Sequence, residues 1–296
     1  MARILVTGGN GQLGNELKSL WGEKPEIFYT DVSELNITEK DAVERFVYDN
    51  KIDVIVNCAA YTAVDKAEED EATATLVNAT APGILADVAK AAGAGRGKGA
   101  LLVHVSTDYV FDGKGCRPYT ESDTPAPAGA YGRTKLLGEQ AVTNSGCSSI
   151  IIRTSWLYSS FGANFVKTIA RLSAERESLN VVFDQIGTPT HAGDLAVAID
   201  AAVTKWLITD TEERKELEGI YHFSNEGVCS WYDFAKEIVH LKSTKCKVNP
   251  VTSDLFPTKA VRPAFSVLDK SKIKRNFGIE IRHWREPLSE IDFTTL

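Results

Sequence analysis

The chain has 296 residues, of which 43% are hydrophobic and 25% charged, and its formal net charge is −7. These values are ordinary for a folded globular protein and exclude a long disordered region. The acidic balance also argues against non-specific binding to nucleic acid or to an anionic membrane surface. At this length the chain can bury the core of one large α/β domain and that of a smaller second region.

The amino-terminal residues and the cysteines bear on the cellular compartment. A short apolar run begins at Ile4 without the longer apolar core of a signal peptide, and the sequence has no apolar stretch long enough to span a membrane. The five cysteines are odd in number and widely spaced, which favours neither a disulfide framework nor a zinc site. We therefore expect a cytoplasmic protein with free thiols and no membrane partner, and we assign no metal site.

The first half of the chain alternates short apolar runs with longer helical patterns. Each run is apolar at consecutive positions, as is typical of strands buried on both faces of a parallel sheet. One helix is predicted to end near residue 20, and others are predicted over residues 41–50, 63–92 and 131–142. Thr38 and Asp41 are expected to cap the helix over residues 41–50, and the helix over residues 63–92 is expected to break near Pro82. This alternation predicts a Rossmann-like, doubly wound α/β fold. The predicted strands are residues 4–6, 27–30, 54–57, 101–105 and 149–153.

A glycine-rich turn follows the first predicted strand and precedes the first helix. Gly8, Gly11 and Gly14 allow a tight turn, a close approach to a pyrophosphate and close packing of the helix on the strand. The helix N-terminus also offers N–H groups to the phosphates, so the turn predicts dinucleotide binding. Asp31 ends the second strand, where a carboxylate can bind the adenosine ribose. This favours NAD over NADP, although a nearby Arg or Lys can still admit a 2′-phosphate.

Three polar side chains lie near the fourth predicted strand and the helix after it. Tyr131 and Lys135 are four residues apart and share a helix face, and Thr107 stands at the strand end. Because a free tyrosine has a pKa of about 10, a nearby ammonium is expected to lower that pKa. We therefore expect Tyr131 to donate a proton, Lys135 to act on Tyr131 and on the nicotinamide ribose, and Thr107 to hold a carbonyl oxygen.

The regular alternation fades after residue 153. Helices are predicted over residues 163–176 and 192–207, and the second has the apolar spacing of a helix that packs on a sheet. The two regions are therefore expected to be interleaved. We predict a dinucleotide-binding domain over residues 1–153, with residues 190–208 packing back onto it. A smaller C-terminal α/β substrate-binding region is predicted over residues 154–189 and 209–296.

Several stretches resemble the extended short-chain dehydrogenase/reductase family and, within it, the dTDP-4-dehydrorhamnose reductases, over nearly the whole chain. The resemblance implies reduction of the C4 keto group of dTDP-4-dehydro-6-deoxy-L-mannose to dTDP-L-rhamnose with NADH or NADPH, in polysaccharide biosynthesis. Some members are described as metal-assisted dimers, so the resemblance allows a homodimer. The stretches are residues 8–14, 53–57, 59–68, 106–111, 131–135, 153–158, 184–190 and 262–269.

The resemblance also implies roles for individual residues. Tyr131 would donate the proton, and Thr107, Asp108 and Trp156 would contact the sugar, although packing is an equal alternative for Trp156. Arg262 lies in a loop expected to close over the nucleotide sugar, where it binds substrate or serves as a structural ion-pair partner. The family often has histidine in place of Tyr61 and sometimes an aromatic in place of Val105. The implied cofactor-binding residues are Gly8, Gly11, Gln12, Leu13, Gly14, Asp31, Ala60, Tyr61, Thr62, Tyr131 and Lys135.

Two alternative functions remain at this stage. A nucleotide-sugar 4,6-dehydratase or 4-epimerase shares the cofactor turn and the tyrosine–lysine pair, but related dehydratases place a glutamate where this chain has Tyr109, so elimination lacks an evident acid. An epimerase would retain tightly bound NAD. The second alternative is a non-catalytic regulatory subunit, against which the intact Thr107, Tyr131 and Lys135 argue.

Overall fold

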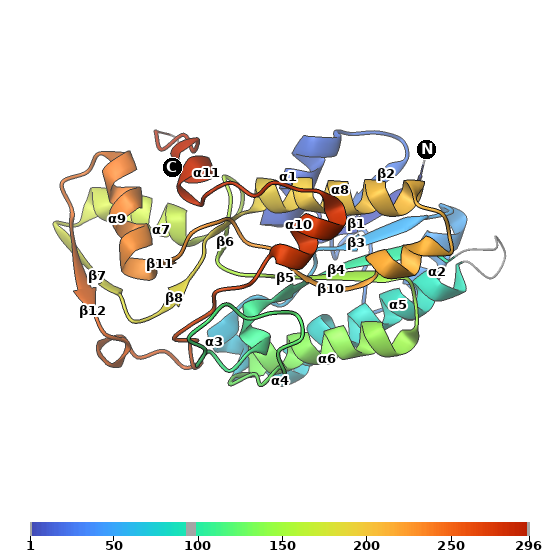
Figure 1. Cartoon of the computed structure of the whole chain (residues 1–296), viewed down its shortest axis with the longest axis horizontal. Coiled ribbons are helices and arrows are strands. Elements are labelled where there is room, and N and C mark those ends of the chain that lie inside the picture. The colour runs from blue at the N-terminus through green and yellow to red at the C-terminus, as the bar shows by residue number, and fades with distance from the viewer. Residues whose placement is uncertain (1, 93–98, 295–296) are drawn as a thin grey trace.

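The computed structural model describes residues 2–92 and 99–294. The described residues form a six-stranded sheet in which every neighbouring pair of strands is parallel (Figure 1). The five strands predicted from the sequence are all present. In spatial order the strands are β10 (Gly219–His222), β5 (Ser149–Thr154), β4 (Leu101–Thr107), β3 (Val54–Asn57), β1 (Ile4–Thr7) and β2 (Ile27–Thr30).

Helices cover both faces of this sheet (Figure 1). One face packs against α1 (Gln12–Trp21), α8 (Ala192–Ile208) and α10 (Ser271–Phe277), and the other against α2 (Lys40–Asp49), α5 (Ala81–Ala91) and α6 (Ala130–Ser145). The two cores are apolar and closed to solvent, since Val56 and Ile199 on one side and Ile55 and Leu85 on the other are fully buried. The Rossmann-like α/β architecture therefore follows from strands that are apolar on both faces.

Two predicted details of the helices are wrong. Thr38 does not cap α2, because its hydroxyl donates to Asn36 Oδ1 at 2.8 Å and the helix begins only at Lys40. The long helix over residues 63–92 is broken at residues 68–70, between α3 (Val64–Ala67) and α4 (Glu71–Thr75), rather than near Pro82. A π-helical turn, Leu76–Thr80, joins α4 to α5, and this irregular turn lets the helical path continue past the proline.

The remaining elements form a smaller unit at one end of the sheet, which we call the small lobe (Figure 1). Its helices pack around a separate core that includes the buried Phe234 and Trp284. We call the sheet and the helices on its faces the large lobe. The elements of the small lobe are α7 (Phe165–Glu175), α9 (Trp231–Lys242), α11 (Arg285–Ser289), the parallel pair β7 (Ser178–Val182) and β12 (Lys247–Val251), and the antiparallel pair β8 (Ile186–Gly187) and β11 (Cys229–Ser230).

The chain crosses between the lobes several times. A parallel pair, β6 (Leu157–Tyr158) and β9 (Thr190–His191), lies at their junction. Residues 209–296 are predicted to lie wholly in the smaller region, but β10 joins the central sheet beside β5, and α10 packs on α8 and β10. The four residues of β10 carry too short a pattern to reveal this pairing in the sequence. The division into two domains itself stays a prediction.

Helices long and apolar enough to cross a membrane are absent from residues 2–92 and 99–294. Cys58, Cys116, Cys147, Cys229 and Cys246 are all free thiols, as predicted.

Candidate active site

A cavity of about 800 Å³ lies between the carboxyl ends of the central strands and the small lobe. This is the position at which open parallel sheets bind ligands, because the loops after neighbouring strands diverge there. Its volume suits a dinucleotide together with a second small molecule. The predicted site residues that line it are Gly8, Gly11, Gln12, Leu13, Gly14, Asp31, Ala60, Thr62, Thr107, Asp108, Tyr131, Lys135 and Trp156.

The glycine turn between β1 and α1 has no room for side chains. Gly8 adopts a φ of +66°, and a Cβ there would lie 2.7 Å from Ala59 N. A Cβ on Gly14 would lie 2.4 Å from Gly8 O, so α1 can approach the turn only with glycine at this position. Gly11 precedes α1 and carries no side chain to cap it, which leaves the first N–H groups of the helix to bind an anion. These features fit the pyrophosphate of a dinucleotide.

Asp31 lies at the edge of the same cavity, directly after β2. Its carboxylate accepts from Asn10 N at 3.1 Å and from Val32 N at 2.8 Å. These backbone contacts hold the carboxylate next to the glycine turn, where the adenosine ribose of a bound dinucleotide is expected.

Tyr131 and Lys135 lie on the first turns of α6 and face the cavity together with Thr107 at the end of β4. Burial lowers the pKa of Lys135 to about 8, and its ammonium donates to Val105 O at 2.7 Å. Burial raises the pKa of Tyr131 above its ordinary value, and a hydrogen bond with Thr107 offsets this only in part. The sequence predicted that the Tyr131 pKa is lowered. This prediction is wrong, because burial has the largest effect on that pKa and raises it.

Asp108 is a buried carboxylate at the floor of the site. Its side chain is 3% exposed, and Oδ1 accepts from Thr107 Oγ1 at 2.9 Å. Its Oδ2 has no hydrogen-bond partner among the described residues. Burial raises the pKa of Asp108 to about 6, although the hydrogen bond from Thr107 acts in the opposite direction. Such an oxygen, facing a cavity, is suited to accept a hydrogen bond from a hydroxylated ligand.

An aromatic wall closes the small-lobe side of the cavity, and we define it as Trp156, Phe165, Trp231 and Phe234. The Trp156 and Trp231 rings stack with their centroids 3.6 Å apart and an interplanar angle of 9°. Trp156 adopts a φ of +48°, and its indole lies so close to Gly187 that a Cβ there would be 2.6 Å from it. Trp156 is thus held in place by both backbone and packing, at a surface suited to the apolar face of a ligand.

Two predicted site residues do not line the cavity. The backbone of Tyr61 is fixed by the Asn78 side chain, which accepts from Tyr61 N at 2.8 Å and donates to Tyr61 O. The Tyr61 ring packs against a small cluster that includes Ala67. Arg262 donates to Asp65 Oδ2 at 2.6 Å and to Tyr109 Oη at 3.1 Å. Arg262 therefore forms an ion pair, as one of its two predicted roles requires, and its role in substrate binding stays a prediction.

Comparison with known proteins places this site in a family. The family described as RmlD substrate binding domain matches residues 2–293. The chain belongs to this family. It is similar to a dTDP-4-dehydrorhamnose reductase of Aggregatibacter actinomycetemcomitans, with 42% identity over 98% of each protein.

Two solved structures share the fold of this RmlD-family member over nearly its full length. A dTDP-4-dehydrorhamnose reductase ortholog of Clostridium acetobutylicum has a TM-score of 0.90 and 42% identity, covering 99% of this chain and 100% of that one. The dTDP-4-dehydrorhamnose reductase of Bacillus anthracis, solved in complex with NADP, has a TM-score of 0.88 and 38% identity, covering 98% of both chains. The predicted fold class and family are confirmed.

The sequence did not reveal several residues that shape this RmlD-family site. Trp231 is the clearest, since it follows Ser230 in a Ser-x-x-Asp capping box with Asp233 that marks the start of α9, but nothing local indicates that it stacks on Trp156. Asn164 also lines the cavity, as the N-cap of α7. Both depend on contacts between distant segments. No cluster of three or more His, Cys, Asp or Glu arranged to hold a metal is found within residues 2–92 and 99–294.

Proposed function

We propose that this chain is an NAD(P)H-dependent oxidoreductase that reduces the C4 keto group of dTDP-4-dehydro-6-deoxy-L-mannose to give dTDP-L-rhamnose. The observation that carries the proposal is one cavity containing both the glycine turn and the set of Thr107, Tyr131 and Lys135. The relatives named dTDP-4-dehydrorhamnose reductase, at about 40% identity over nearly their full length, support the choice of substrate.

Reduction of a ketone requires a hydride at carbon and a proton at oxygen. The nicotinamide cofactor, when bound, supplies the hydride, and the glycine turn and Asp31 hold it. Tyr131 donates the proton. A tyrosine hydroxyl is protonated at neutral pH, which is the state that a proton donor needs. Lys135, buried one helical turn along α6, stabilises the phenolate that remains and binds the nicotinamide ribose.

Thr107 and Asp108 orient the sugar. Thr107 already contacts both Tyr131 and Asp108. Its hydroxyl is therefore held next to the position that a carbonyl oxygen must take to reach the proton donor. Asp108 Oδ2 accepts a hydrogen bond from a sugar hydroxyl, and Trp156 packs on the apolar side of the 6-deoxy ring. We infer that the aromatic wall selects a deoxy sugar because it offers apolar surface where a hydroxylated C6 would need a partner.

Either NADH or NADPH serves as the cofactor in this proposal. Asp31 favours NADH, since a carboxylate beside the ribose repels a 2′-phosphate. The NADP complex of the Bacillus anthracis relative supports NADPH instead. A cytoplasmic location and a homodimer stay predictions.

The alternative functions are less well supported. The Tyr109 hydroxyl accepts from Arg262, and its ring packs edge-to-face against Tyr131 with centroids 5.4 Å apart, so it has no carboxyl group to promote elimination of water. A regulatory subunit would not require the buried Lys135 or Asp108.

The experiment that tests this function is a cofactor oxidation assay. Purified protein is mixed with dTDP-4-keto-L-rhamnose, generated in situ, and with NADH or NADPH, and absorbance of the reduced cofactor is followed. Oxidation that depends on the sugar supports the reductase and ranks the two cofactors. A lack of oxidation with both would contradict the proposal, and tightly bound NAD in the same preparation would favour the epimerase.

A further inference from the structure

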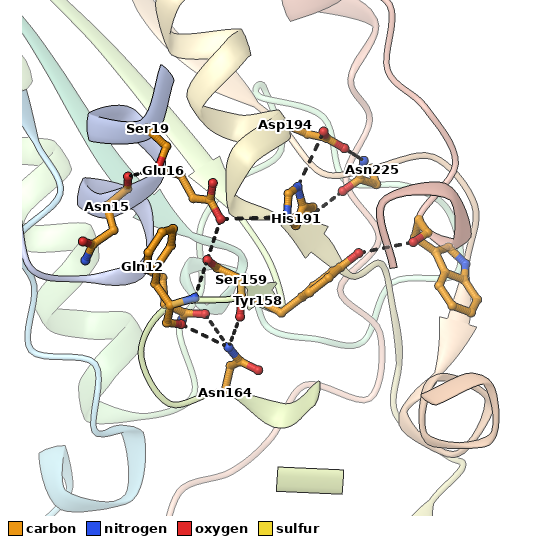
Figure 2. A network of polar contacts seen from close by, with 12 residues as sticks. Gln12, Asn15, Glu16, Ser19, Tyr158, Ser159, Asn164, His191, Asp194 and Asn225 are labelled. Carbon is orange, nitrogen blue, oxygen red and sulfur yellow. Dashed lines mark hydrogen bonds and ion pairs between the residues drawn. The ribbon is translucent and has the colours of Figure 1, made fainter. Parts of the chain in front are cut away.

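A network of polar contacts joins α1 to the small lobe beside the glycine turn (Figure 2). It starts from two residues one helical turn apart on α1, Gln12 and Glu16. Asn164 Nδ2 donates to Gln12 Oε1 at 3.0 Å, and Ser159 Oγ donates to Glu16 Oε1 at 2.6 Å. Two separate contacts therefore hold residues 159–164 against α1, the helix that follows the glycine turn.

The side chain of Asn164 can adopt only one amide orientation. As the N-cap of α7, its Oδ1 accepts from Lys167 N at 3.1 Å, and its Nδ2 donates to Ser159 O at 2.7 Å. A flipped amide would place NH₂ against an N–H and oxygen against a carbonyl, so both contacts would become repulsive. The direction of the Asn164 amide is thus set by the small lobe, independently of Gln12.

This fixed amide in turn sets the direction of the Gln12 carboxamide. Because Asn164 offers an N–H, Gln12 must turn its oxygen toward Asn164, and its Nε2 is left to donate on the opposite side. Gln12 lines the cavity, in the first turn of α1 where the cofactor pyrophosphate is expected, and a Cβ on Gly162 would lie 3.0 Å from its Cγ. The close approach of Gly162 limits the other positions that the Gln12 side chain can take.

We propose that Asn164 is a positioning residue for the cofactor: it orients Gln12 so that the carboxamide presents an N–H donor to the diphosphate or ribose of the bound dinucleotide. The inference rests on the proposed function, since it requires a nicotinamide dinucleotide in the cavity. It also links the lobes, because the group that fixes Gln12 is the helix cap of α7 in the small lobe.

Two substitutions separate this role from helix capping. Asn164→Asp and Asn164→Ser both keep an oxygen that caps α7. The carboxylate of the first turns the Gln12 amide, so that an oxygen faces the cofactor phosphates, and the shorter side chain of the second releases Gln12. The contact between Ser159 and Glu16 keeps the segment docked on α1 in both variants.

The experiment measures the Kd of NADPH and of NADH by fluorescence titration, without sugar, and the Tm of each protein. We expect the Kd to rise on the order of tenfold in Asn164→Asp and less in Asn164→Ser. The Tm should change little in Asn164→Ser and should fall in Asn164→Asp, because its second carboxylate oxygen lies against the Ser159 carbonyl. In a Gln12→Ala background, Asn164→Ser should have no further effect on the Kd, because the residue through which it acts is gone.

Three outcomes overturn the inference. One is a wild-type Kd in both Asn164 variants, and another is an equal effect of Asn164→Ser with and without Gln12. In either case the wild-type protein still binds cofactor and the proposed function stands. A wild-type protein that binds neither NADH nor NADPH overturns the proposed function together with the inference.

Discussion

The glycine turn and the aromatic wall face the same cavity but are built in different ways. The turn is a continuous stretch of chain between β1 and α1, and its shape depends on the absence of side chains at Gly8 and Gly14. The wall is made of large side chains brought together from α7, α9 and the segment between β5 and β6, as with Trp156 and Trp231. The turn is therefore determined by one short stretch of sequence, whereas the wall exists only once distant segments have packed together.

The largest expected effect tests the chemistry between these two regions. Tyr131→Phe removes the proton donor but leaves the glycine turn and the aromatic wall in place. We expect kcat to fall by about 10²- to 10⁴-fold, the usual contribution of positioned acid catalysis. The Kd for NADPH should stay near the wild-type value. Steady-state kinetics and cofactor titration measure both quantities, and unchanged turnover would show that Tyr131 is not the proton donor.

The next largest effect is expected from Gly14→Ala, which disturbs the glycine turn but not the aromatic wall. In Gly14→Ala the new Cβ would lie 2.4 Å from Gly8 O, so the turn must shift, and we expect cofactor affinity to fall about 10- to 100-fold. Gly83→Ala in α5 is the matched control, because its Cβ would make only an ordinary 3.4 Å contact with Ala141 of α6. Cofactor titration of both variants is the measurement. Equal affinities in the two would contradict the steric account of the turn.

A third prediction concerns acid stability at the junction of the two lobes. Burial by itself would raise the pKa of Asp194, but the neighbouring His191 and hydrogen bonds from Arg282 and Asn225 outweigh it and lower that pKa to about 2. Since the folded-state pKa lies below the unfolded value, this stabilisation is present above about pH 4 and is lost as the pH falls toward 2. It amounts to about 2 kcal/mol.

Asp194→Asn tests this acid dependence. Urea unfolding at pH 5 and at pH 3 should show a smaller loss of stability in the variant than in the wild type, because the variant lacks the titrating carboxyl. The same pH-dependent loss in both proteins would mean that other carboxylates carry the effect.

The smallest expected effect concerns the aromatic wall. Trp231→Ala removes the ring that stacks on Trp156, and the KM for the sugar should rise about 2- to 12-fold, as expected for loss of one aromatic pair. The Kd for NADPH should not change, because the glycine turn is untouched. Trp231→Phe keeps an aromatic partner for Trp156, so its KM for the sugar should lie between those of the wild type and Trp231→Ala. If Trp231→Ala changed the Kd for NADPH as much as the KM for the sugar, the glycine turn and the aromatic wall would not act separately.

The features predicted correctly from the sequence are those that a short stretch of chain determines. The apolar runs identified five strands of the sheet, and glycine spacing identified the turn, because both depend on neighbouring residues. Tyr131 and Lys135 could be paired because a helix places residues four apart on one face.

The features that were missed depend on contacts between distant segments. The addition of β10 to the sheet, the stacking of Trp156 on Trp231, and the contact between Gln12 and Asn164 each join residues far apart in the chain. The direction of the Tyr131 pKa shift was also predicted wrongly, because the shift is dominated by burial, which the sequence does not give.

The most direct test of the central claim is the fate of a labelled hydride. NADPH carrying deuterium at C4 of the nicotinamide, prepared separately for each face, is incubated with the protein and dTDP-4-keto-L-rhamnose, and the sugar product is examined by mass spectrometry and NMR. We predict that one of the two labels appears at C4 of dTDP-L-rhamnose. Product without deuterium from either cofactor, or label that returns to the nicotinamide, would contradict a reductase.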